Sequence, residues 1–297
     1  MTGPERGFLL LTSQLGDPER KPLTVAQMRL LATRVEQMAR PRVDRDLSPQ
    51  DLVELGYGWE MAHRIVKLLS EEALLDRYLR RAAKQGCGPL TRVSEGYPPV
   101  VRQRLGLDSP GCLWYKGDLS LLNRPKISLV GSRVLRSENI AFAREAGRQA
   151  ALQGFALVSG NAAGADSEAQ NACLEAGGTV ISVVAFELER HRERERVLYL
   201  AEDGFDLPFS AQRALSRNRV IHSLGQKTIV AQSGLEKGGT WDGTVRNLRF
   251  GWSPVFCFDD GSLAMDRLMQ MGADPIGVKD LTDLSALKPG NMSLFDQ

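Results

Sequence analysis

The chain has 297 residues, of which 42% are hydrophobic and 25% are charged, and its formal net charge is +2. A chain of this length and composition can bury the core of a full α/β domain plus a smaller second domain. Because the overall charge is small, a site for a polyanion must come from cations that cluster locally, and the global field neither supports nor excludes nucleic acid.

The cysteine pattern argues against a metal site. Four scattered cysteines form no C-x-x-C pair, and the three histidines are dispersed as well. No apolar stretch approaches the ~20 residues of a membrane span, and the short apolar run at residues 8–11 does not make a signal peptide. The sequence therefore predicts a cytoplasmic protein with reduced thiols and with no metal, no cofactor and no membrane segment.

Residues 1–85 are predicted to form a small helical module without strands. Ser48 and Pro49 are typical of a helix start, and two glycines at 56 and 58 separate two helical stretches. That arrangement resembles a helix-hairpin-helix unit, whose hairpin N–H groups can hold a phosphate. The alternative is a module in which the helices only pack on each other.

The central stretch of the chain, residues 126–166, has the pattern of a βαβ unit. An apolar strand is predicted at Lys126–Val130, a helix at 137–153 and a second strand at 155–158. Each strand ends in a loop of small residues, VGSR at 130–133 and SGNAAGAD at 159–166. Such loops lie where open α/β sheets bind ligands, and their N–H groups favour an anion. The alternative is a plain Rossmann-like turn that needs glycine only for its geometry.

Strands and helices continue to alternate after this unit. Helices are predicted at 166–176, 211–224 and 240–250, strands at 179–185, 227–231, 254–258 and around 275–278, and a solvated helix in the charged run at 189–197. Alternation of this kind favours a mostly parallel Rossmann-like sheet with helices on both faces. The predicted domains are a helical module over 1–85, the sheet domain over 86–285 and a flexible tail over 286–297.

Several motifs in order give the chain a family resemblance. The segments VGSR, SGNAAGAD and SRNRVI at 216–221, preceded by YPPVV and LWYKGDLSLL, resemble the DNA-processing protein A (DprA/Smf) family over roughly 90–260. The resemblance implies sequence-independent binding of single-stranded DNA without catalysis, delivery of the strand to RecA recombinase in natural transformation, and a homodimer. The winged-helix module of some relatives is not expected here.

The resemblance also implies a set of phosphate-binding positions. Arginines and backbone donors can follow a phosphodiester without reading bases, whereas Asp166 is expected to cap or orient its loop. Arg217 and Arg219 point nearly opposite ways on a helix, and the family pattern favours Asn218 and Arg219 for the pocket. The candidate site residues are Gly131, Ser132, Arg133, Ser159, Gly160, Gly164, Asp166, Arg217, Asn218, Arg219, Gly239 and Thr240.

The sequence departs from the family pattern in the second loop. Ala163 and Ala165 stand where relatives usually carry Arg and Ile, so one cationic contact is expected to be missing. The tract at 233–244 is longer and richer in glycine than a minimal version, which lets Gly239 and Thr240 extend the anion site. Trp241 is open to two interpretations, a base-stacking platform or a buried residue at a helix start.

The C-terminal residues NMSLFDQ resemble the short peptide with which replication proteins bind a sliding clamp. Met292, Leu294 and Phe295 would be the apolar anchors, although Asn291 replaces the usual leading Gln. The alternative is a disordered terminus with chance apolar residues.

Three other functions fit parts of the same pattern. A nicotinamide dehydrogenase is disfavoured because Gly131-Ser132-Arg133 is not G-x-G-x-x-G. A nucleotide-cleaving phosphoribohydrolase needs a Glu where this chain has Gly243, so a general acid or base is missing. A sensor of a nucleotide signal shares every loop with the DNA-binding interpretation, and only binding data separate the two.

Overall fold

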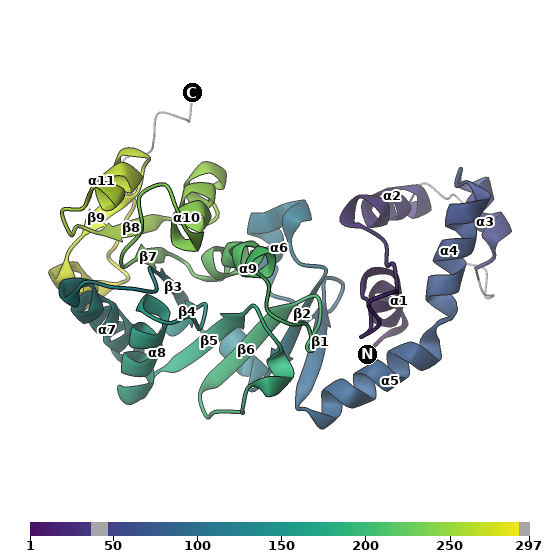
Figure 1. Ribbon diagram of the computed structural model, residues 1–297, viewed down its shortest axis with the longest axis horizontal. Coiled ribbons are helices and arrows are strands. Elements are labelled where there is room, and N and C mark those ends of the chain that lie inside the picture. Colours follow the sequence, from purple (N-terminus) through teal and green to yellow (C-terminus); the bar gives the residue numbers. More distant parts are fainter. Residues whose placement is uncertain (37–46, 291–297) are drawn as a thin grey trace.

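One nine-stranded sheet organises the molecule in this computed structural model, which describes residues 1–36 and 47–290 (Figure 1). The strand order is β1-β2-β6-β5-β4-β3-β7-β8-β9. The strands are β1 (Cys87–Thr91), β2 (Cys112–Lys116), β3 (Lys126–Val130), β4 (Ala156–Ser159), β5 (Thr179–Val184), β6 (Val197–Glu202), β7 (Thr228–Val230), β8 (Val255–Phe258) and β9 (Asp274–Ile276). All pairings from β6 to β9 are parallel, and only β1 with β2 and β2 with β6 run antiparallel.

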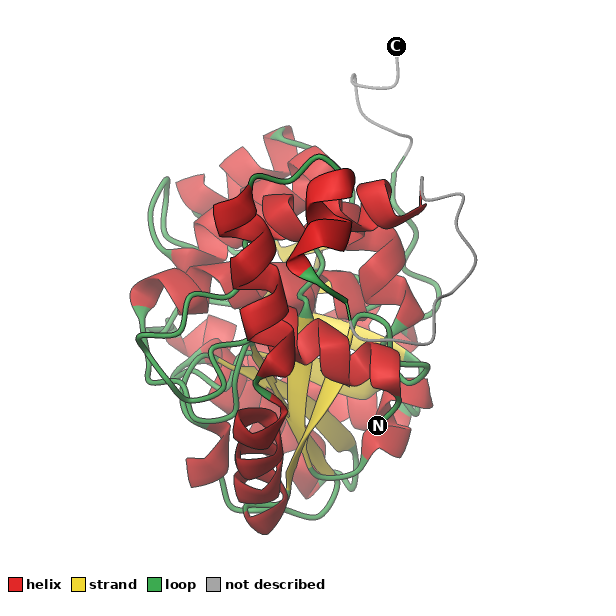
Figure 2. Ribbon diagram, turned by 90° about the vertical axis from the view of Figure 1, so that its right-hand side faces the viewer, coloured by secondary structure: helices red, strands yellow, loops and turns green. Residues whose placement is uncertain are grey.

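Helices cover both faces of the sheet, as predicted (Figure 2). One face packs against α7 (Ser137–Leu152) and α8 (Ala165–Glu175), which supply Phe142 and a series of buried alanines to the core. The other face packs against α6 (Pro99–Leu105), α9 (Ala211–Leu224), α10 (Gly239–Phe250) and α11 (Leu263–Gln270). The central strands are buried on both sides, which is why their sequences are continuously apolar.

The N-terminal helices form a smaller bundle at one end of the molecule (Figure 1). They are α1 (Gly3–Thr12), α2 (Val25–Glu36), α3 (Pro49–Glu54), α4 (Trp59–Ser70) and α5 (Glu72–Lys84). Leu52, Ile65 and Leu68 lie in a core of their own. Helices α1 and α5 belong instead to the core of the sheet domain, where Tyr78 packs on Trp114 and Phe205. The predicted division of the chain at residue 85 stays a prediction.

Most predicted elements lie within a residue or two of the observed ones, but the charged run at 189–197 was predicted wrongly. It contains a 3₁₀ turn at Leu188–Arg190 and then a bend, and the buried strand β6 begins at Val197. Alternating charges without an apolar stripe give a helix no face to bury, so the run forms the approach to a strand. Strand β1 was also missed, because Gly88 and Pro89 are atypical of strands. None of the helices in the described residues is long and apolar enough to cross a bilayer.

Candidate functional site

A cavity of about 600 Å³ opens at the carboxyl end of β3. Strand β3 lies between β4 and β7. From β3 the strand order runs through β4, β5 and β6 on one side and through β7, β8 and β9 on the other. Open α/β sheets bind ligands at such switch points. The walls come from the loop after β3, the start of α8, the inner face of α9 and the loop before α10. Its lining residues include Gly131, Ser132, Arg133, Asp166, Arg217, Asn218, Gly239 and Thr240.

The two small-residue loops lie directly against each other. A side chain at Gly164 would come within 2.4 Å of the carbonyl oxygen of Ser132, and φ at Gly164 is +80°. A Cβ at Gly131 would come within 2.4 Å of that of Ala165. Glycine is therefore required at both positions by close approach, and Gly164 also by its left-handed backbone.

Asp166 organises the second loop from inside the protein. Its carboxylate accepts hydrogen bonds from the backbone N–H groups of Gly160 and Ala162, each at 3.1 Å. Burial raises the pKa of Asp166, while the guanidinium of Arg217 and the two N–H donors oppose that rise. Since these two N–H groups are already satisfied, the second loop does not offer them to a ligand. This geometry agrees with the predicted orienting role of Asp166.

Arg217 is the buried cation of the cavity. Only 8% of the residue is exposed, yet its Nε and Nη1 atoms have no hydrogen-bond partner among the described residues. Its guanidinium fills the space beside Gly160, where a Cβ would lie 1.6 Å from Nη1. Burial lowers the pKa of Arg217, although the carboxylates of Asp166 and Glu202 counteract this. A buried guanidinium whose N–H groups have no acceptor can donate these hydrogen bonds to an anion.

Two further cations and an aromatic ring surround the opening. Arg133 and Lys237 are exposed and line the cavity, and neither forms an ion pair or a side-chain hydrogen bond with another described residue. Phe209 is 55% exposed at the rim. Neither Lys237 nor Phe209 was predicted as a site residue from the sequence. Lys237 directly precedes the Gly238–Gly239 pair of the predicted anion loop, and that position was the signal available in the sequence.

Comparison with known proteins identifies the family of this chain. The family model described as DNA recombination-mediator protein A matches residues 89–283. The chain belongs to this family. The DNA processing protein DprA of Bacillus subtilis is 28% identical over 218 residues, which cover 68% of this chain and 72% of that protein. DprA of Streptococcus pneumoniae is 32% identical over 148 residues, 44% of this chain and 50% of that one.

Two solved DprA structures share the fold. The X-ray structure of DprA from Streptococcus pneumoniae superposes with a TM-score of 0.59 at 24% identity and covers 87% of this chain and 97% of that one. The structure of DprA from Helicobacter pylori, described for its single-stranded DNA binding mode, gives a TM-score of 0.55 at 21% identity and covers 66% and 94%. The Rossmann-like fold and the family predicted from the sequence are both confirmed.

In this DprA-family chain, four predicted site residues do not line the cavity. Ser159 is fully buried and accepts a hydrogen bond from Gln170, while Gly160 and Gly164 make room for Arg217 and for the first loop. The assignment of Arg219 needs correction. Its Nη2 and Nη1 atoms donate to the two carboxylate oxygens of Glu202 at 2.8 and 3.2 Å, and Nε donates to the carbonyl of Asp108 at 2.9 Å. The helical twist thus directs Arg217, not Arg219, into the cavity.

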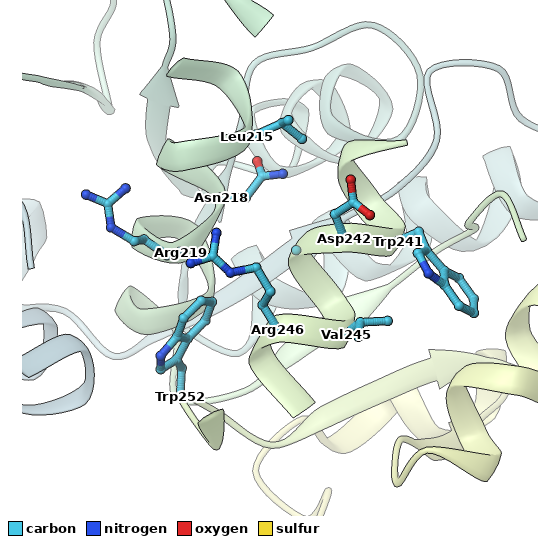
Figure 3. A pocket seen from close by; sticks show the side chains of 9 residues that line it. Leu215, Asn218, Arg219, Trp241, Asp242, Val245, Arg246 and Trp252 are labelled. Atoms are coloured by element: carbon cyan, nitrogen blue, oxygen red, sulfur yellow. The ribbon is translucent and has the colours of Figure 1, made fainter. Parts of the chain in front are cut away.

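A second cavity, of about 350 Å³, lies between α9 and α10 (Figure 3). It shares Leu215 and Asn218 with the first cavity, and the guanidinium of Arg246 lies 5.7 Å from the ring centre of Trp252. Figure 3 shows the side chains of Arg219 and Trp241 pointing away from its centre. Trp241 is only 8% exposed and belongs to the core under α10. The buried interpretation of Trp241 is therefore the correct one.

Proposed function

We propose that this protein binds single-stranded DNA through its phosphodiester backbone, without regard to sequence along most of the strand and without catalysis. The observation that carries the proposal is the convergence of Arg133, Arg217 and Lys237 on one cavity. None of the three forms an ion pair within the described residues. Cations that form no ion pair with a carboxylate of the protein are available for phosphates.

The remaining groups of the cavity also suit a phosphodiester. The hydroxyl of Thr240 and the backbone around Gly238 and Gly239 supply neutral donors in a narrow space, whereas the hydroxyl of Ser132 already donates to the carbonyl of Gln232 at 3.3 Å. One N–H of Asn218 Nδ2 donates to the carbonyl of Gly239 at 2.9 Å and so holds the loop and α9 together, which leaves the second N–H of the amide for a phosphate. The exposed ring of Phe209 at the rim offers a face on which any base can stack.

Binding without catalysis is supported by the state of the titratable groups in the cavity. Asp166 is occupied by two backbone donors, and burial lowers the pKa of His222 to about 3, so that it stays neutral. His222 is also engaged with Thr228 and Asn247. A general acid or base needs a pKa near the working pH and access to the substrate, and neither group has both.

The family membership supports a wider role in which the bound strand is handed to RecA recombinase during transformation, with a homodimer as the working unit. The H. pylori relative is described by its binding of single-stranded DNA. The four cysteines are free and buried, as expected in the reducing cytoplasm where this exchange would take place. Binding of a sliding clamp through Met292, Leu294 and Phe295 stays a prediction, since these residues lie outside the described part of the chain.

The proposal is tested by fluorescence anisotropy of a labelled oligo-dT of ~30 nucleotides, titrated with the protein at several salt concentrations. We expect tight binding that weakens with salt and that neither the duplex nor a free mononucleotide displaces. Arg133→Ala should weaken binding to all sequences alike and reduce the salt slope by about one phosphate contact. Arg148→Ala, on the exposed side of α7 and paired with Glu145, is the matched control and should behave as the wild type.

The competing nucleotide-sensor function makes the opposite prediction. A cavity of about 600 Å³ is also of the size that holds a small ligand. If a mononucleotide displaced the oligonucleotide, or if the oligonucleotide did not bind, the cavity would be a small-molecule site and the DNA-binding proposal would be wrong.

A further inference from the structure

A smaller chamber of about 260 Å³ lies behind Arg217, at the carboxyl ends of β5 and β6. Its walls are formed by Val184, Ala185, Glu202, Asp203, Gln212, Arg213, Ser216 and Arg217. Arg217 lines both this chamber and the cavity of about 600 Å³ proposed to bind phosphate (the phosphate cavity), so the two spaces adjoin at its side chain. A ligand that places a phosphate in the first can therefore place an adjoining group in the second.

The chamber contains buried donors that lack an acceptor. Arg213 Nε has no hydrogen-bond partner among the described residues, as is also true of Nε and Nη1 of Arg217. The other nitrogens of Arg213 are used, since Nη1 donates to the carbonyl of Pro208 at 2.7 Å and Nη2 to that of Glu202 at 3.1 Å. Buried donors are nearly always satisfied in native proteins, so these unsatisfied ones point to a missing acceptor.

The chamber also offers one free acceptor, the carboxylate of Asp203. Asp203 is an exposed residue at the edge of the chamber, and its carboxylate takes part in no ion pair or hydrogen bond with the described residues, although Arg219 and Arg213 attract it at longer range. Glu202 does not compete for a ligand, because both of its carboxylate oxygens already accept from Arg219. The backbone of Asp203 is held in the left-handed region at φ +68°, which Asp and Asn tolerate better than most other residues.

We propose that this chamber binds the base of a single guanine nucleotide in the strand whose backbone occupies the phosphate cavity. Guanine presents O6 and N7 as acceptors, which suit arginine donors, and N1–H and N2–H as donors, which suit a carboxylate. Thymine has no exocyclic amino donor. Adenine presents an amino group where guanine has O6. Cytosine also presents an amino group and lacks the N7 acceptor. Guanine is thus the base that uses both kinds of group in the chamber.

This inference rests on the proposed binding of single-stranded DNA, and it adds one preferred base to a strand that is otherwise held by its backbone. It follows that affinity depends little on sequence in general and increases when a guanine can reach the chamber. One well-formed base contact discriminates by roughly 5- to 100-fold.

The test compares oligo-dT with the same oligonucleotide carrying one central guanine, adenine, cytosine, hypoxanthine or 7-deazaguanine. We expect the guanine oligonucleotide to bind roughly 5- to 100-fold more tightly than oligo-dT. Hypoxanthine lacks the 2-amino group but keeps N1–H, so it should lose the part of the gain that comes from the contact of N2–H with Asp203. 7-Deazaguanine lacks N7 and should lose the part that depends on the arginines.

Asp203→Asn is the decisive variant, because Asn tolerates the left-handed backbone as well as Asp does and removes only the charged acceptor. We expect the ratio of affinities for guanine and hypoxanthine oligonucleotides to fall to about one. The control is Asp242→Asn. Asp242 is exposed on α10 and lines the second cavity, between α9 and α10, but not this chamber. It should raise affinity for all oligonucleotides alike and keep the guanine ratio.

The outcomes separate the two proposals. Tight, salt-sensitive binding of oligo-dT with no gain from guanine would leave the DNA-binding function standing and overturn the guanine chamber. A guanine gain that persists in Asp203→Asn would assign the preference to another part of the surface and overturn it as well. Failure of every oligonucleotide to bind would instead refute the proposed function itself.

Discussion

At the scale of single residues, the phosphate cavity depends on one glycine that leaves space for one arginine. Gly160 has no side chain, and the guanidinium of Arg217 occupies the volume that a Cβ would need. The N–H of the same glycine donates to Asp166, which fixes the loop from the other side. Gly160 therefore sets both the loop and the position of the buried cation, and it does so without contacting the cavity itself.

Gly160→Ala should displace Arg217 from the cavity. The added Cβ would lie 1.6 Å from Nη1, so the guanidinium must move, and overpacking of this kind costs about 1–3 kcal/mol of stability. We expect weaker binding of oligo-dT, measured by anisotropy, together with a lower midpoint in urea. Gly7→Ala in α1, where a Cβ meets nothing within 4 Å, is the control and should change neither binding nor fold. Wild-type affinity in Gly160→Ala would show that Arg217 does not hold phosphate.

At the scale of elements, α9 is joined to α10 and β7 by a buried polar cluster. His222 on α9 contacts Thr228 on β7 at 3.3 Å and Asn247 on α10 at 3.1 Å. Helix α10 can approach α9 this closely because Gly239 and Gly243 face Asn218, and a Cβ at Gly243 would lie 3.1 Å from Nε2 of His222. The cluster fixes the two helices whose ends form the cavity, so its protonation state affects the site as well as the fold.

Acid should destabilise this helix pair. Burial lowers the pKa of His222 from 6.5 to about 3 in the folded protein, so the unfolded chain binds more protons between these pH values. The stabilisation from a neutral His222 is therefore present above pH 6.5 and is lost as the pH falls towards 3, with a slope of at most about 1.4 kcal/mol per pH unit.

Urea denaturation of the wild type and His222→Gln between pH 4 and 7 measures this effect, because the substitution removes the titrating group. We expect the stability advantage of the wild type to shrink steadily as the pH falls. A difference between the two proteins that is constant over this range would mean that His222 does not exclude its proton in the folded state.

At the scale of the whole molecule, the helical module and the sheet domain share part of one hydrophobic core. Tyr78 of α5 packs on Trp114 of β2 and on Phe205, with ring centres 5.3 and 4.8 Å apart, and its hydroxyl donates to Asp206 at 2.6 Å. Arg81 pairs with the same Asp206. Because aromatic packing and a shared carboxylate join the two parts, we expect the chain to unfold in one cooperative transition.

Removal of the Tyr78 ring should separate the two parts. Tyr78→Ala deletes a large buried side chain at a cost of about 3–5 kcal/mol, and we expect a second transition in urea and earlier cleavage by protease within the N-terminal helices. Tyr78→Phe loses only the hydrogen bond to Asp206 and should keep a single transition, with a loss of about 1 kcal/mol. Two transitions in the wild type would contradict a shared core.

The sequence by itself determined the sheet, most of its elements and the loops of the site. The strand at Lys126–Val130 and the helix at Ala211–Leu224 were predicted at their observed bounds, since apolar runs and helical spacing are local signals. The small residues after β3 and β4 marked the two loops that meet beside the cavity for the same reason. Strand β6 was missed because its antiparallel pairing with β2 and its burial depend on distant segments.

Only the tertiary structure decided which side chains face the cavity. Arg217 and Arg219 on α9 lie in different surroundings. Arg219 pairs with Glu202 at the end of a distant strand, whereas the guanidinium of Arg217 occupies the space beside Gly160. Lys237 joins Arg217 at the cavity, from a loop in which only the glycines were recognisable in the sequence. Which side chain faces the cavity depends on ion pairs and close contacts between segments far apart in the chain. Those interactions exist only once the chain has folded.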